Sequence, residues 1–218
     1  MRNSVELAVN VVTTGISTFV GADVGGVLGA QLGSVVPVFI ADAVRRSGVR
    51  VASVAETSTA LAGLNGESLK YWLETPRNAA LFTEALNAAW QALDEDKLKT
   101  LSQALADGLT DDAVLELSRL RVRTTAALDS VHLLVLEFLT EPPRPERAGW
   151  SRQEILERFP SLGPGIDPVL STLDQSGCLV DVSGYGGSSG RQASEYGSDY
   201  LEFVRRAGGV QVLTADEE

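Results

Sequence analysis

Four glycines at four-residue intervals are the strongest constraint on the N-terminal part of this chain. They are Gly21, Gly25, Gly29 and Gly33. They lie in an apolar run, residues 7–41, in which Asp23 is the only charged residue. Residues four apart share one face of a helix, so these glycines would form a groove that admits a second helix at close range. A glycine costs about 1 kcal/mol relative to alanine inside a helix, and close packing is the expected compensation.

The apolar run predicts a helical hairpin, residues 1–48, that turns near Asp23. Residues 24–41 carry no charge and approach the minimum length of a membrane span, about 18 residues. Arg45, Arg46 and Arg50 follow, as expected on a cytoplasmic flank. The hairpin would lie either in a protein core or oligomer contact, or at the cytoplasmic face of a membrane. The sequence leaves both environments open.

Residues 49–124 have the pattern of a helical bundle. Residues 77–93 place apolar side chains at helical spacing, and Thr75-Pro76 is a helix start. Asp94 is a candidate cap for a second helix that we expect Gly108 to end. Asp111 or Thr110 is a candidate cap for a third helix. Short connections predict antiparallel neighbours.

Residues 125–209 predict three helices, a strand, a glycine-rich loop, a second strand and a last helix, which is the order of a winged helix. The expected first helix covers residues 125–139. A capping box at Ser151 opens the second helix, and Asp167-Pro168 opens the third. Ser194 is the expected cap of the last helix. Residues 210–218 predict an edge strand and an acidic tail. The fold class is therefore mainly α, with a glycine-rich hairpin, a helical bundle and a C-terminal winged helix with a small β-hairpin.

Composition argues against most catalytic chemistry. The chain has one cysteine, Cys178, and one histidine, His132. A disulfide within the chain, a cysteine-rich metal site and a two-histidine zinc motif are therefore excluded. No phosphate-binding loop of the Walker type is present. We predict a non-enzymatic cytoplasmic protein with no catalytic residues, no metal and no cofactor.

The charge disfavours nucleic acid as a partner. The net charge is −11 and the pI is near 4.6, whereas nucleic-acid binding relies on basic side chains. The expected recognition helix, residues 167–176, contains no lysine or arginine. The candidate interaction or nucleic-acid surface is limited to scattered arginines: Arg152, Arg158, Arg191, Arg205 and Arg206. A protein partner or a second copy of the chain is the expected ligand, with inner-membrane association as a further possibility. The alternative is a winged-helix transcriptional regulator whose helical part dimerises or senses a ligand.

Two stretches resemble known bacterial proteins. Residues 173–180, a glycine-rich loop, and then Ser194 and Gly197 before an apolar helix are similar to the close of many bacterial winged-helix domains. The apolar front end, residues 41–46 and the helical middle together resemble the abortive-infection alpha family. That family is linked to phage resistance and has no known catalytic motif, so the resemblance implies a role in bacterial anti-phage defence.

Overall fold

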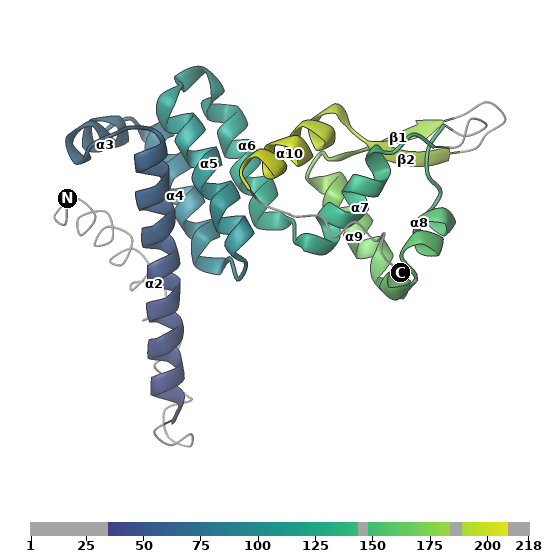
Figure 1. The fold of residues 1–218 in the computed structure, drawn as a ribbon, viewed down its shortest axis with the longest axis horizontal. Helices are drawn as coiled ribbons and strands as arrows, with labels where there is room; N and C mark the ends of the chain where they lie inside the picture. Colours follow the sequence, from purple (N-terminus) through teal and green to yellow (C-terminus); the bar gives the residue numbers. More distant parts are fainter. Residues whose placement is uncertain (1–34, 144–147, 184–188, 209–218) are drawn as a thin grey trace. The chain divides into compact units, whose positions relative to one another are not determined.

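The computed structural model describes residues 35–143, 148–183 and 189–208, drawn as ribbons in Figure 1. The fold is mainly helical with one small antiparallel sheet, as predicted. The chain divides into two compact units between Val122 and Arg123, within one helix. The glycines Gly21, Gly25, Gly29 and Gly33, the expected turn near Asp23 and the tail from residue 210 lie outside the described residues.

The first unit is built from helices. They are α2 (Val35–Leu61), α3 (Gly66–Leu73), α4 (Pro76–Gln91), α5 (Glu95–Thr110), the short 3-10 helix η1 (Asp112–Val114) and the first part of α6 (Leu115–Ala127). Helices α2, α4 and α5 pack against one another (Figure 1). Helix α2 runs without a break through the expected boundary between residues 48 and 49.

Apolar side chains at helical spacing form the core of this unit. Leu81 and Ala85 of α4, Leu105 of α5 and Val54 of α2 are fully buried. Asp94 caps α5 as predicted, because its carboxylate accepts the backbone N–H of Asp96. These local signals and the apolar stripes together explain why this segment forms a bundle.

The prediction for Gly108 is wrong. Helix α5 continues past it to Thr110, so Gly108 is inside the helix. A Cβ at this position would lie 2.4 Å from Leu81 Cδ2 and 3.1 Å from Ser118 Cβ. Gly108 is therefore needed for close packing within the unit and not for helix termination.

The second unit combines helices with the sheet. Its elements are the end of α6, then α7 (Ser130–Thr140), α8 (Arg152–Arg158), the 3-10 helix η2 (Pro160–Gly165), α9 (Ile166–Gln175), β1 (Leu179–Ser183), β2 (Ser189–Ala193) and α10 (Glu195–Arg206). Strands β1 and β2 pair antiparallel, with Asp181 opposite Arg191. Trp150 forms an isolated antiparallel bridge with Arg191 on the other side of β2. The core includes Leu136, Ile155, Ile166 and Phe203.

The expected helix over residues 125–139 is two helices, which corrects the prediction. Helix α6 ends at Ala127 and α7 begins at Ser130. Asp129 is the N-cap of α7, and its backbone N–H donates to Nδ1 of His132 over 3.1 Å. A reciprocal cap of this kind satisfies the free N–H groups of a new helix and fixes where it begins. His132 therefore has a structural role at the start of α7.

Glycines allow the backbone of residues 149–150 to lie against the sheet. A Cβ on Gly149 would lie 2.4 Å from Val182 Cγ2, and a Cβ on Gly190 would lie 2.5 Å from the carbonyl carbon of Gly149. The Trp150 ring packs on Phe138 with ring centroids 4.3 Å apart. The bridge at Trp150 therefore depends on two positions without side chains.

Helix α9 ends at a well-defined cap, and helix α10 begins at another. Gly177 has φ +72°, and the N–H of Cys178 donates to the carbonyl of Leu173, which closes α9 in a Schellman motif. Ser194 Oγ accepts the N–H of Gly197 over 2.9 Å and donates to the carbonyl of Gly177 over 2.7 Å. Ser194 therefore caps α10 and ties it to the end of α9. The predicted Ser151 box is also present, with Glu154 as its partner.

Candidate functional site

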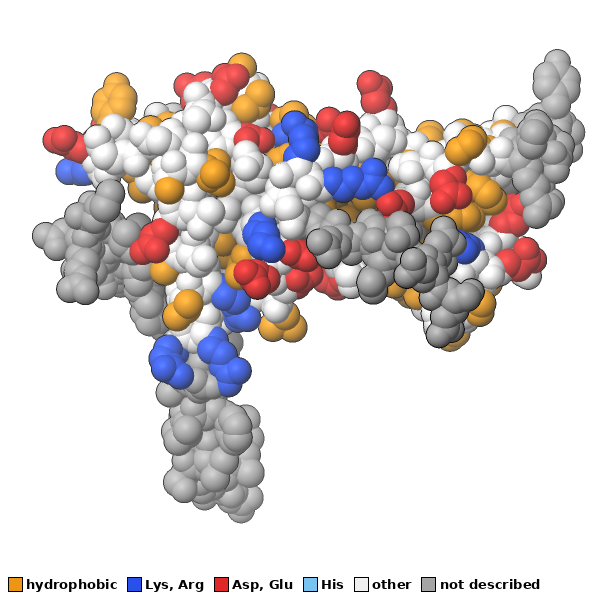
Figure 2. Space-filling view, viewed as in Figure 1, with side chains coloured by type: hydrophobic (Ala, Val, Ile, Leu, Met, Phe, Trp, Pro, Cys, Tyr) orange, Lys and Arg blue, Asp and Glu red, His pale blue; other side chains and the backbone are white. Residues whose placement is uncertain are grey.

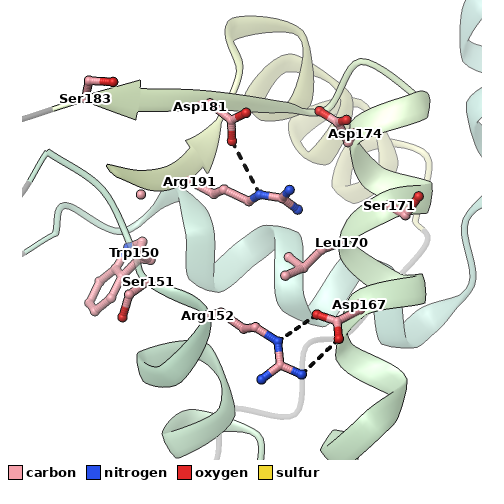
Figure 3. Close-up of a pocket in the computed structure, with 11 residues that line it drawn as sticks. Trp150, Ser151, Arg152, Asp167, Leu170, Ser171, Asp174, Asp181, Ser183 and Arg191 are labelled. Atoms are coloured by element: carbon pink, nitrogen blue, oxygen red, sulfur yellow. Dashed lines mark hydrogen bonds and ion pairs between the residues drawn. The ribbon is translucent and has the colours of Figure 1, made fainter. Parts of the chain in front are cut away.

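A cleft of about 640 Å³ lies in the second unit between α9 and the β1–β2 hairpin, with the start of α8 at its side (Figure 3). Its lining combines polar and charged side chains with the apolar side chains of Trp150 and Leu170. The lining residues are Trp150, Ser151, Arg152, Asp167, Leu170, Ser171, Asp174, Asp181, Ser183, Gly190 and Arg191. Two arginines and three aspartates thus share a small concave surface.

Arg152 and Asp167 form a two-point ion pair in the cleft. The Nε and Nη2 atoms of Arg152 donate to the two carboxylate oxygens of Asp167 over 2.7 and 2.9 Å. These hydrogen bonds hold the pKa of Asp167 below its usual value and raise the pKa of Arg152. Asp167 was expected to cap the third helix, but α9 begins at Ile166 with Gly165 as its N-cap. The Asp167 side chain instead links α9 to α8.

The second arginine also faces an aspartate. Arg191 Nε lies 3.4 Å from a carboxylate oxygen of Asp181, its cross-strand neighbour (Figure 3). The Asp181 side chain is 78% exposed and that of Arg191 is 37% exposed. Asp174, two helical turns after Asp167 on α9, lines the same cleft and is exposed. The cleft therefore contains one more carboxylate than guanidinium groups.

The structure brings together only part of the predicted arginine surface. Arg152 and Arg191 line the cleft, whereas Arg158, Arg205 and Arg206 do not. Arg205, on α10, pairs with Glu137 of α7. Arg191 lies in β2 and not in the loop before it.

The aspartates of the cleft were missed as a site. The sequence shows no motif that groups Asp167, Asp174 and Asp181, because they come from the two ends of a helix and the middle of a strand. One part of the site could have been predicted from spacing. Asp167 and Asp174 are seven residues apart, which places them on the same helix face. The contribution of Asp181 depends on the strand register, which the sequence does not specify.

The described residues include one buried thiol and no cluster of metal-binding side chains. Cys178 is buried, and burial raises the pKa of its thiol to about 12, so it is protonated at neutral pH. No group of three or more histidine, cysteine or acidic side chains is placed to hold a metal ion in the described part of the chain. The features of the cleft that could recognise a ligand are therefore its shape and its charged side chains.

The charge distribution is mixed on the face shown in Figure 2. Acidic and basic side chains of the described residues are interspersed on that face. Helices within residues 35–143, 148–183 and 189–208 also lack an apolar stretch long enough to cross a membrane.

Comparisons with known proteins give no match: no family model, no curated protein and no solved structure is similar to this chain.

Proposed function

We propose that this chain is a non-enzymatic interaction protein whose second unit is a winged helix adapted to bind protein instead of DNA. The order α7, Trp150 bridge, α8, α9, β1, β2 supports the winged helix, because such units place a short first strand between their first two helices. Helix α9 would then be the recognition helix, and the loop between β1 and β2 the wing.

The ion pairs of the cleft are the observation that carries this proposal. A recognition helix reads DNA with basic or amide side chains, and phosphates are held by arginine and lysine. Here Arg152 is bound at two points by Asp167, and Arg191 lies against Asp181. Asp174 adds a negative charge on the helix that would enter the groove. The face that would read DNA repels phosphate, which favours a protein ligand.

DNA binding provides the direct test. Fluorescence anisotropy should detect no complex between the full-length chain and a labelled duplex of its own upstream region or of unrelated sequence at low salt. The triple variant Asp167→Asn, Asp174→Asn, Asp181→Asn should gain salt-sensitive duplex binding, because it frees both arginines. A wild-type complex that is lost in Arg191→Ala would contradict the proposal.

The second candidate is the winged-helix transcriptional regulator, with the first unit as dimeriser or sensor. The order of elements in the second unit favours it, since this topology is common among DNA-binding domains. The same titration separates the two functions. Sequence-specific binding to the upstream duplex, weakened by Arg191→Ala, would establish the regulator.

The N-terminal glycines belong to the same proposal of an interaction protein. Gly21, Gly25, Gly29 and Gly33 would mediate self-association or contact with the inner membrane, and the setting would be bacterial anti-phage defence. The variant Gly25→Leu, Gly29→Leu should lose self-association in light scattering or lose membrane pelleting after fractionation. A glycine-to-leucine change at Gly165 provides the comparison, because a Cβ there would meet nothing within 4 Å and φ is −74°. If the first variant still self-associates and still pellets with membranes, the groove has no such role.

A further inference from the structure

The outer edge of β1 has backbone groups that no strand pairs with in the described residues. Arg191 exchanges both backbone hydrogen bonds with Trp150, over 3.0 and 2.9 Å. Its N–H and carbonyl therefore point away from β1, so Asp181 and Arg191 are a non-hydrogen-bonded pair. It follows that the N–H and carbonyl of Asp181 point away from β2, toward the edge where this two-stranded sheet ends.

Asp181 and Val180 place an acidic and an apolar side chain on opposite faces of this edge. Asp181 faces the cleft, where it lines the same surface as Asp174. Val180, on the other face of β1, is an apolar side chain left 43% exposed. A strand added beside β1 would place alternate residues next to these two faces. Basic residues would fit beside Asp181 and β-branched residues beside Val180.

A second copy of the chain fits this edge poorly. Antiparallel pairing of two β1 strands centred on Asp181 would bring the carboxylates of the two Asp181 residues close together. Like charges directly opposite on a sheet are destabilising. The excess carboxylate of the cleft instead favours a cationic strand from another protein.

We infer that the outer edge of β1 binds an extended, basic segment of a partner protein as an added strand, with its Lys or Arg side chains on Asp181 and Asp174. This inference rests on the proposed function and names the chemistry of the partner. Backbone hydrogen bonds to Asp181 would supply affinity, and the carboxylates would supply the preference for a basic sequence.

The test uses the full-length chain and a fluorescein-labelled peptide of four Val-Lys repeats. Anisotropy should show saturable binding that weakens as salt rises. The variant Asp174→Asn, Asp181→Asn should weaken binding at least about tenfold, the equivalent of about 1.4 kcal/mol. Glu202→Gln, which removes an exposed carboxylate on α10, should change it less than about twofold. A peptide of Val-Glu repeats should not bind.

Amide hydrogen exchange separates an added strand from simple charge attraction. Bound peptide should slow exchange at the Asp181 amide at least about tenfold, while the Val180 amide, which already faces β2, should change little. Absence of Val-Lys binding, binding without protection at Asp181, or an equal loss in Glu202→Gln would each overturn the inference. These results are independent of the DNA titration. A wild-type DNA complex that requires Arg191 would contradict the proposed function, whereas the peptide results test only the added strand.

Discussion

Gly197 is a residue of the second unit at which no side chain fits. A Cβ there would lie 2.3 Å from the backbone carbonyl oxygen of Cys178. Backbone atoms cannot move aside as a flexible side chain can. The sequence resembles winged-helix domains at Ser194 and Gly197, and the structure gives a physical reason for both residues. Ser194 caps the helix, and Gly197 lets the helix approach the backbone of Cys178, just before β1.

Replacing Gly197 with alanine should therefore destabilise the second unit. We expect Gly197→Ala to lower its free energy of unfolding by about 1–3 kcal/mol, the usual cost of overpacking. Gly165→Ala is the matched control, because its Cβ would meet nothing within 4 Å and its φ is −74°. It should change stability by less than about 0.5 kcal/mol. Urea titration of both variants measures the difference, and equal stabilities would contradict the close approach.

At the scale of elements, the Arg152–Asp167 ion pair links α8 to α9. Because its pKa is lowered in the folded protein, Asp167 contributes stability above its unfolded pKa of about 3.9. That contribution is lost as the pH falls through the lower folded pKa. Both side chains are more than half exposed, so the effect on stability is small. Its main effect is on the orientation of two charges in the cleft.

Titration of the Asp167 carboxyl by NMR should show this interaction directly. The wild-type pKa should lie below about 3.9, and Arg152→Gln should return it toward that value. Arg158→Gln removes the same charge from the other end of α8 and should leave the Asp167 titration unchanged. An unshifted Asp167 in the wild-type protein would show that the ion pair does not persist in solution.

At the scale of the whole molecule, the chain has two cores, and unfolding need not be a single transition. Cys178 is the only thiol and is buried in the second unit. It should react with a disulfide reagent at pH 8 far more slowly than a free cysteine, because burial blocks access and raises its pKa to about 12. Labelling rates across a urea series should follow opening of the second unit alone. Rapid labelling without urea would contradict its burial.

The features of the fold and the cleft that could be predicted from the sequence are those that depend on residues close together in the chain. The caps at Asp94, Ser151 and Ser194 were predicted, because capping involves residues within three positions of each other. Gly108 was misread, since its reason is contact with Leu81, distant in sequence. The cleft was missed for the same reason: Arg152 meets Asp167 only through tertiary packing.

The close contact at Gly149 and Gly190 has a consequence for how this sequence can vary. A side chain at either position pushes the same two backbones apart. Once one glycine is replaced, the contact is already lost, so replacing the other should add little. In a library of random double mutants, the destabilisation from replacing both glycines should be smaller than the sum of the two single effects. A protein that tolerates a side chain at one of the two positions should therefore also tolerate one at the other. Natural relatives would then keep both glycines or abandon both.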